Sequence, residues 1–317
     1  MAFNFVKDRP ETVFDNNFLL IDRLQKIRQI INKYGEENFV VSYSGGKDSN
    51  VLSFLIDKAL PDNQIPRVYA DTGIELKAVR DFVKQKCEED SRFEIIKPTV
   101  PIKKMLESEG YPFKSKRHSD FVAQYQRHNG NLEEKGISSV QNYIGQSDKQ
   151  WSVRKLCPKV LLYQFTSEFT LKVSSKCCVR LKKDPFHKWQ RERAKPYSII
   201  GIMPDESGQR ESAQCLAFKP NGELKAFQPL VPVTKEWEDW LIQTYDIKLP
   251  IVYYPPYNLS RTGCCGCPFN VAVEKQLAML KENFPSDYKV ACAVWKPVYD
   301  EYRRIGYRLK ENTNENH

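Results

Sequence analysis

A short glycine-rich stretch near the start of the chain has residue types suited to holding a phosphate. It follows the apolar run 39–43 and consists of Ser44, Gly45, Gly46, Lys47, Asp48 and Ser49. Two glycines let the backbone approach an anion, and the N–H groups of the loop act together with the positive end of the following helix. The Walker and dinucleotide fingerprints need other spacings. An ordinary glycine turn is the alternative, but the Ser, Lys and Asp side chains favour nucleotide binding.

Cysteines form the second group with a chemically suited spacing. The chain has nine of them, and its first 15 residues hold no apolar signal-peptide core. We therefore expect a cytoplasmic protein whose cysteines serve metal ligation or sulfur chemistry rather than disulfides. Cys264 and Cys267 have the Cys-x-x-Cys spacing, and the adjacent Cys177 and Cys178 add two thiols. Four thiolates suit zinc or a [4Fe–4S] cluster. Zinc ribbons normally use two Cys-x-x-Cys knuckles, so the adjacent pair favours iron–sulfur.

Composition limits the class of protein. The 317 residues allow one large or two moderate domains, and 41% hydrophobic with 28% charged residues is ordinary for a soluble globular chain. No apolar run approaches the ~20 residues that span a bilayer, so no membrane partner is expected. The net charge of +9 favours an anionic partner such as a nucleotide, a sulfate ester or nucleic acid.

The elements around the glycine-rich stretch predict a parallel sheet. Strands are predicted at 39–43, 67–70, 93–96 and 198–202, and helices at 17–34 (N-capped by Asp15 or Asn16), 74–88, 103–109, after Ser115, after Thr234 and within 270–307. A strand, helix and strand at this spacing form a parallel unit, and ligands bind at the carboxyl ends of such strands. Ser44 and Asp71, which follow the first two strands, should therefore lie at one edge of the sheet.

Two stretches of the chain are harder to interpret. Residues 129–149 show no strong periodicity and are predicted to be rich in loops. The run from Lys172 to Lys195 contains nine Lys or Arg residues against Asp184 and Glu192. A solvated basic face is the simplest interpretation of such a run.

These motifs together resemble a known family. The glycine-rich stretch resembles the pyrophosphatase loop of the adenine-nucleotide α-hydrolases. The segment from Cys177 to Pro185 is similar to a motif of the assimilatory adenylyl-sulfate reductases, in which a Cys-Cys pair and a later Cys-x-x-Cys bind a [4Fe–4S] cluster. The resemblance implies that the cluster ligands are Cys177, Cys178, Cys264 and Cys267. It also implies nucleotide contacts from Asp71, Thr72, Gly73, Gly201, Glu206, Ser207 and Arg210. The implied fold is α/β, a parallel twisted sheet with helices on both faces.

The chain departs from the reductases in one respect. Its last residues lack the Glu-Cys-Gly motif whose cysteine attacks the sulfate. In this it is similar to the ATP pyrophosphatases of DNA phosphorothioation systems, which implies cleavage of ATP to AMP and pyrophosphate to activate an acceptor for sulfur incorporation. Lys47 and Arg210 would offset the phosphate charge, and Asp48 or Asp71 would hold Mg²⁺.

Two alternative functions and several binding partners are also expected. The chain could reduce adenylyl sulfate or phosphoadenylyl sulfate with a thiol supplied by a partner, or it could be a zinc-stapled nucleic-acid-binding protein without catalysis. The basic run from Lys172 to Lys195 would face DNA or tRNA, with Trp189 available for stacking. A cysteine desulfurase or another donor would supply the sulfur. The acceptor, the sulfur donor and the oligomeric state stay open.

The predicted domain organisation follows from these elements. A helical segment 1–36 packs on the core, and residues 37–232 form the nucleotide-binding domain with an insertion around 110–170. A C-terminal helical region 233–310 carries the Cys-x-x-Cys pair, and 311–317 form a disordered tail. Cys157, Cys215 and Cys265 have no assigned role, although Cys215 is a candidate sulfur carrier.

Overall fold

The structure is a computed structural model, and it describes residues 10–133, 137–146, 155–203 and 214–310. The chain divides into two compact units. Unit 1 consists of Met1–Asp71, Lys77–Lys97 and Pro185–Thr262, and unit 2 of Thr72–Leu76, Pro98–Asp184 and Gly263–His317. The glycine-rich stretch therefore belongs to unit 1, whereas the four predicted cluster cysteines belong to unit 2.

Unit 1 is built on a six-stranded sheet with the order β3-β2-β1-β4-β6-β5. The strands are β1 (Phe39–Tyr43), β2 (Arg67–Ala70), β3 (Phe93–Ile96), β4 (Tyr197–Ile199), β5 (Leu216–Phe218) and β6 (Leu224–Phe227). Neighbouring strands are parallel except for the antiparallel pair β5 and β6. The predicted α/β fold with a mainly parallel sheet is thus confirmed.

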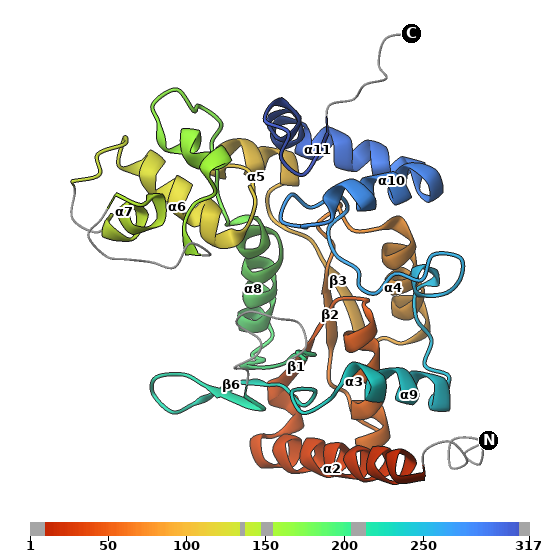
Figure 1. Cartoon of the computed structure of the whole chain (residues 1–317). Coiled ribbons are helices and arrows are strands. Elements are labelled where there is room, and N and C mark those ends of the chain that lie inside the picture. Colours follow the sequence, from red (N-terminus) through yellow and green to blue (C-terminus); the bar gives the residue numbers. More distant parts are fainter. Residues whose placement is uncertain (1–9, 134–136, 147–154, 204–213, 311–317) are drawn as a thin grey trace. The chain divides into compact units, whose positions relative to one another are not determined.

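Helices cover both faces of this sheet (Figure 1). The helices of unit 1 are α2 (Pro10–Tyr34), α3 (Lys47–Ala59), α4 (Lys77–Glu89), α9 (Lys235–Tyr245) and, apart from its first residue, α8 (Asp184–Glu192). Successive side chains of a strand point to opposite faces. Phe39, Val41 and Tyr43 of β1 accordingly pack into the core that α3 and α9 share, whereas Val40 packs against Trp189 of α8.

Unit 2 is mainly helical. Its helices are α5 (Ile102–Glu109), α6 (Lys116–Arg127), α7 (Ser138–Ile144), α10 (Val273–Asn283) and α11 (Pro285–Arg304). A 3₁₀ turn covers Lys159–Phe165 and a π-helical turn covers Val179–Lys183. The region 110–170, predicted as an insertion, lies in this unit. No helix in the described part of the chain combines the length and apolarity needed to cross a membrane.

The predicted boundaries hold for β1, β2 and β3, whereas three other predictions differ from the structure. The first helix begins at Pro10, so neither Asp15 nor Asn16 is its N-cap. Strand β4 ends at Ile199 rather than at 202, and α7 occupies part of the segment predicted to be loop-rich. The predicted cap Thr234 is confirmed, because its side chain accepts a hydrogen bond from the backbone N–H of Trp237 at 3.3 Å.

Candidate functional site

The glycine loop, residues 44–49, connects β1 to α3 at the carboxyl end of the strand. Gly45 has φ +70°, and a Cβ at this position would lie 2.8 Å from Val83 Cγ2 and 2.9 Å from Val79 Cγ1 of α4. Only glycine fits this left-handed conformation and this close approach. Gly46 is the N-cap of α3 and supplies no side chain to the helix amides. The amides at this end of the helix are suited to an anion.

Hydrogen bonds within unit 1 hold the loop in shape. Ser44 Oγ donates to Ser49 Oγ at 3.1 Å, and Ser49 Oγ lies 2.9 Å from the Gly46 carbonyl oxygen. The buried Asn50 amide donates to the Gly46 carbonyl at 2.8 Å and accepts from the Tyr43 hydroxyl at 2.6 Å. Asn50 and Tyr43 were not predicted as site residues from the sequence. A buried amide one position after the loop is the signal that could have indicated them.

Three hydroxyl groups surround Gly46. A Cβ on Gly46 would lie 3.2 Å from both Ser44 Oγ and Thr262 Oγ1 and 3.3 Å from the Tyr253 hydroxyl. The Tyr253 hydroxyl accepts the backbone N–H of Lys47 at 3.1 Å and bonds Thr262 Oγ1 at 3.0 Å. Tyr253 and Thr262 come from the end of unit 1, about 200 residues after the loop, so their placement beside it could not be foreseen from spacing.

The two charged residues of the loop face charged residues of α9. Lys47 Nζ forms an ion pair with Asp239 at 2.8 Å. Burial lowers the pKa of Lys47, but the Asp239 carboxylate outweighs burial and raises the pKa above its usual value. Glu238 is buried, and desolvation together with the neighbouring Asp48 carboxylate raises the pKa of Glu238 to about 8. The Oε1 atom of Glu238 has no hydrogen-bond partner among the described residues.

The remaining predicted nucleotide contacts divide among different parts of the chain. Asp71 follows β2, and its N–H donates to the Ile96 carbonyl at 2.9 Å. A Cβ on Gly201 would lie 3.1 Å from the Asp48 carbonyl oxygen, so Gly201 packs directly on the loop. Thr72 and Gly73 belong to unit 2, where Thr72 Oγ1 donates to the Glu75 carboxylate at 2.9 Å. The predicted contacts Glu206, Ser207 and Arg210 lie outside the described residues.

Unit 2 brings the four predicted cluster cysteines into electrostatic contact. The thiols of Cys177 and Cys178 share a hydrogen bond, which raises the pKa of Cys177 and lowers the pKa of Cys178. Cys264 and Cys267 both interact electrostatically with Cys178, and burial raises the pKa of Cys267 to about 11. The described residues nevertheless contain no group of three or more His, Cys, Asp or Glu side chains already arranged around a metal position.

Cationic side chains accompany these thiols. Lys182 lies beside Cys264 and Cys178 and forms an ion pair with the buried Glu75 at 2.8 Å. Burial alone would lower the pKa of Lys182, but Cys264 and Glu75 raise it. Lys116 lies near Cys178 as well. Because positive charge stabilises thiolates, Lys182 opposes the burial that raises the pKa of Cys264 and Cys267.

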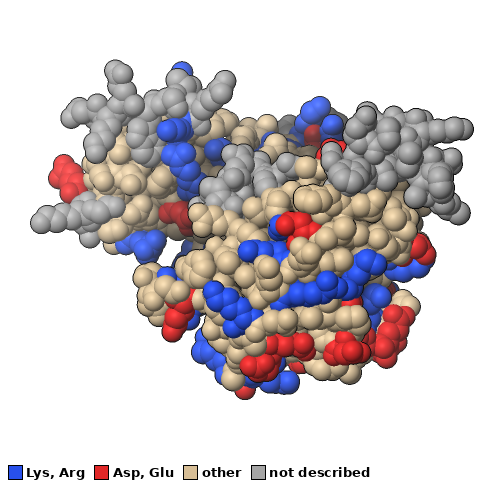
Figure 2. Space-filling model, turned by 90° about the horizontal axis from the view of Figure 1, so that it is seen from below, with Lys and Arg blue, Asp and Glu red and all other residues tan. Residues whose placement is uncertain are grey.

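The basic run from Lys172 to Lys195 does not form one free cationic face. It is divided between the units, and most of its cations have partners: Lys172 with Ser108, Lys176 with Glu109, Arg180 with Glu109 and Asp184, Lys182 with Glu75, Lys188 with Glu192, Arg193 with Glu94, and Lys195 with the Glu37 carbonyl. On the face drawn in Figure 2, Lys and Arg side chains likewise lie among Asp and Glu side chains.

The prediction that Trp189 is available for base stacking is wrong. Its side chain is only 6% exposed and packs against Val40 and Val68 on one face of the sheet. Its indole N–H donates to Glu94 at 2.9 Å. Trp189 is therefore a core residue of unit 1, and no base can stack on it without unfolding α8.

Comparison with known proteins finds similarity around the glycine loop. Residues 38–146 match the family model of the phosphoadenosine phosphosulfate reductase domain. An uncharacterized protein of Methanocaldococcus jannaschii is 33% identical over 111 residues, which are 32% of this chain and 26% of that protein. The match therefore spans about a quarter of the length of that relative.

Two solved structures are similar at low identity. The phosphoadenylyl-sulfate reductase from Candida auris, in its phosphate complex, has a TM-score of 0.41 and 12% identity over 73% of this chain and 82% of its own. The U34-tRNA thiolase from Methanococcus maripaludis, with its [4Fe–4S] cluster, has a TM-score of 0.38 and 15% identity over 89% of this chain and 80% of its own. Residues 38–146, which contain β1, the glycine loop and β2, are thus the part of the chain that is similar to the phosphoadenosine phosphosulfate reductase domain.

Proposed function

We propose that this protein is an ATP pyrophosphatase that activates an anionic acceptor, a nucleic acid, for sulfur incorporation. The observation that carries the proposal is the glycine loop, which is built at the carboxyl end of β1 inside the matched segment and presents helix amides beside Lys47. Cleavage between the α- and β-phosphates of ATP would transfer AMP to an acceptor oxygen and release pyrophosphate. The adenylylated oxygen is then a good leaving group for an attacking sulfur.

Each group of the loop would contact a particular part of the ATP phosphates. The N–H groups at the start of α3 and the hydroxyls of Ser44 and Ser49 would hold the leaving pyrophosphate. Lys47 would exchange Asp239 for a phosphate oxygen and offset the charge that develops on it. The Tyr253 hydroxyl, which now accepts the Lys47 N–H, would either bond a phosphate or move aside for it.

Asp48 and Glu238 fit a divalent cation beside these phosphates. Glu238 is buried, its Oε1 has no partner among the described residues, and its neighbour Asp48 is a second carboxylate. Carboxylate oxygens are the protein ligands that Mg²⁺ prefers. A bound Mg²⁺ would neutralise part of the pyrophosphate charge. This chain's own contribution is to keep two carboxylates adjacent, which is unfavourable unless a cation or a shared proton compensates.

The donor set of unit 2 fits an iron–sulfur cluster. Cys177, Cys178, Cys264 and Cys267 supply four thiols that interact with one another, and Lys182 lies beside them to offset thiolate charge. A bound [4Fe–4S] cluster would provide a place for sulfur to bind before its transfer. We propose the four cysteines as its ligands, with a cysteine desulfurase or another protein as the sulfur source and the cytoplasm as the location.

Reduction of adenylyl sulfate or phosphoadenylyl sulfate is the second candidate, because the matched family model is named for such a reductase. The two activities differ in their products. Protein purified without oxygen is incubated with radiolabelled ATP, or with either sulfonucleotide and thioredoxin. The proposal expects AMP and pyrophosphate from ATP. Release of sulfite from a sulfonucleotide, without pyrophosphate from ATP, would establish the reductase instead.

A further inference from the structure

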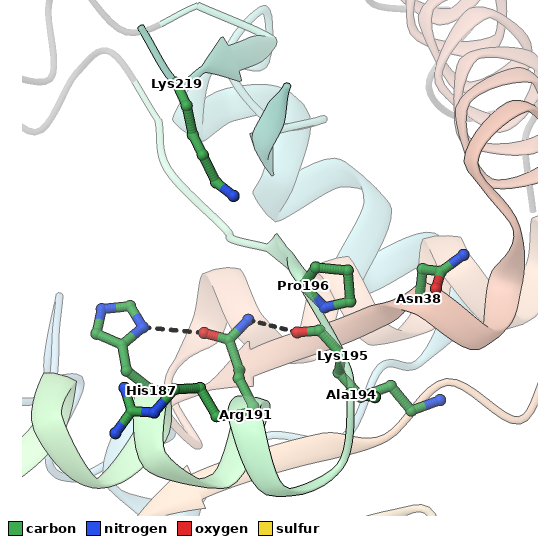
Figure 3. A pocket seen from close by; sticks show the side chains of 8 residues that line it. Asn38, His187, Arg191, Ala194, Lys195, Pro196 and Lys219 are labelled. Atoms are coloured by element: carbon green, nitrogen blue, oxygen red, sulfur yellow. Dashed lines mark hydrogen bonds between the residues drawn. The ribbon is translucent and has the colours of Figure 1, made fainter. Parts of the chain in front are cut away.

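A pocket lined by basic side chains lies in unit 1, away from the glycine loop. It is an open pocket of about 550 Å³, walled by α8, the turn after it, Asn38 before β1 and Lys219 after β5 (Figure 3). We call it the α8 pocket. Four of its lining residues carry cationic or titratable basic side chains, namely His187, Arg191, Lys195 and Lys219. No Asp or Glu is among the described residues that line it.

The charges of the α8 pocket are largely uncompensated. Arg191 is exposed, and its guanidinium has no hydrogen bond or ion pair in the described part of the chain. Lys195 Nζ donates to the Glu37 carbonyl at 2.6 Å, a contact that fixes the amine without neutralising it. Lys219 is paired with Glu223 at 3.0 Å on the exposed hairpin. An exposed ion pair of this kind is weak, so a phosphate can replace the carboxylate at small cost.

A buried glutamine organises the wall of the α8 pocket. Gln190 is 8% exposed; its side chain accepts from His187 Nδ1 at 3.0 Å and donates to the Lys195 carbonyl at 2.9 Å (dashed lines in Figure 3). It also donates to Ser198 Oγ at 3.2 Å, which ties the turn to β4. The backbone that carries Arg191 and Lys195 is thus held before any ligand arrives.

The α8 pocket and the glycine loop lie at opposite edges of the sheet. Asn38 and Pro196 precede the parallel strands β1 and β4, whereas the loop follows the carboxyl end of β1. Five residues of strand separate the two edges, which corresponds to about 17 Å at ~3.3 Å per residue. A single nucleotide in the loop cannot reach the α8 pocket. A nucleic acid can span this distance, because one strand of a duplex places a phosphate about every 3.4 Å along its axis.

We propose that the α8 pocket binds the phosphodiester backbone of a nucleic acid. The proposal rests on the proposed function only in taking the nucleic acid to be the acceptor of sulfur. The guanidinium of Arg191 matches a phosphate through two parallel hydrogen bonds, and Lys195 and Lys219 add point charges around the same opening. The openness of the pocket suits a polymer that passes over it, whereas sites for small molecules enclose most of their ligand.

Binding is measured by fluorescence anisotropy with the full chain purified without oxygen, using a fluorescein-labelled 20-base-pair DNA duplex and a labelled tRNA at several salt concentrations. The pocket variant combines Arg191→Ser with Lys219→Ser. The control variant combines Lys188→Ser with Lys248→Ser, which removes the same charge from unit 1 outside the pocket. All four side chains are exposed, so both variants should fold.

Wild-type protein and the control variant are expected to bind at least one of the two probes, and with the same affinity. The pocket variant should bind it about ten-fold more weakly at moderate salt. For duplex DNA, the slope of log affinity against log salt should be shallower by roughly 1.8, because about 0.9 counterion is released for each phosphate contact. Equal losses in both double variants, or no binding of either probe by wild type, would overturn the proposal. ATP hydrolysis without nucleic acid is assayed separately, so failure of the proposed function is distinguished from failure of the pocket.

Discussion

Lys47 of the glycine loop and Asp239 of α9 form an ion pair of 2.8 Å. The cation expected to contact phosphate is thus held by the protein's own carboxylate, and it is only 22% exposed in this arrangement. In the proposed function, ATP would have to compete with Asp239 for the Lys47 amine. The charge of Lys47 is compensated in this arrangement, so phosphate binding would require one exchange of partners.

Replacing Asp239 by Asn should strengthen the binding of ATP. A half-exposed ion pair is worth at most about 1 kcal/mol, so its removal should lower KM for ATP by up to about five-fold with little change in kcat. Steady-state kinetics of Asp239→Asn provides the measurement. Asp246→Asn, which removes the partner of Lys248, serves as control. An increase of KM in Asp239→Asn would mean that Asp239 positions Lys47 for the phosphate rather than competing with it.

Gly45→Ala should destabilise unit 1 more than the same change at Gly222. Both glycines have positive φ, 70° and 82°, so both variants carry a backbone cost of about 1–2 kcal/mol. Only at Gly45 does the new Cβ also meet the side chains of Val79 and Val83, and overpacking of this kind adds roughly 1–3 kcal/mol. Urea unfolding of both variants checks the difference. Equal losses would show that the approach of α4 does not restrict the loop.

The stability of unit 2 should fall between about pH 6.5 and pH 4 because of His118. The ring is fully buried, with Nδ1 bonded to the Tyr143 hydroxyl at 2.9 Å and Nε2 to Gln164 at 2.6 Å. Burial lowers the pKa of His118 to about 4. Within this window the unfolded chain binds a proton that the folded chain does not, so stability decreases as the pH falls, by at most about 1.4 kcal/mol per pH unit.

Urea unfolding of wild-type protein at pH 7, 6 and 5 measures this dependence. His187→Gln removes an exposed histidine and should keep the slope, whereas His118→Gln should reduce it while lowering stability at pH 7 through loss of the buried contacts. A wild-type slope that His118→Gln leaves unchanged would assign the titration to another group.

Substitution of a cluster cysteine should remove bound iron. Cys178→Ser or Cys264→Ser is expected to abolish most of the iron and sulfide in protein purified without oxygen, since the remaining three thiols cannot complete the ligand set. Cys292→Ser, in α11, should retain both. Iron and acid-labile sulfide analysis gives the readout. Colourless wild-type protein with one tightly bound zinc would favour the zinc-stapled binding protein.

Much of unit 1 could be predicted from local sequence. The apolar run 39–43, the glycines after it and the strand at 67–70 are features of neighbouring residues, and they led directly to β1, the loop and β2. The same is true of Thr234, whose capping depends only on the next three residues. The proximity of the Cys177–Cys178 pair to Cys264 and Cys267 could likewise be predicted, because thiols at such spacings bind metals together.

The rest depends on contacts between distant parts of the chain. Nothing local to Tyr253 or Asp239 indicates that they bond Lys47. Helix α9 reaches the loop by packing on α3, and the segment Ile251–Tyr253 does so by packing on α4. Whether a cation in a basic run is paired depends on distant contacts for the same reason. Arg191 and Arg193 look alike in the sequence, but Arg193 has the carboxylate of Glu94 from β3 within reach and Arg191 does not.

Cleavage of ATP to AMP and pyrophosphate distinguishes the proposed ATP pyrophosphatase from the other candidate functions. Wild-type protein, Asp48→Ala and the surface control Asp62→Ala are each incubated with Mg²⁺ and α-labelled ATP, with and without a DNA duplex or tRNA. We expect AMP and equimolar pyrophosphate from wild type and Asp62→Ala. The rate of Asp48→Ala should be lower by at least about 100-fold, in line with the removal of a preorganised charge contact. Full turnover by Asp48→Ala, or formation of ADP instead of AMP, would contradict it.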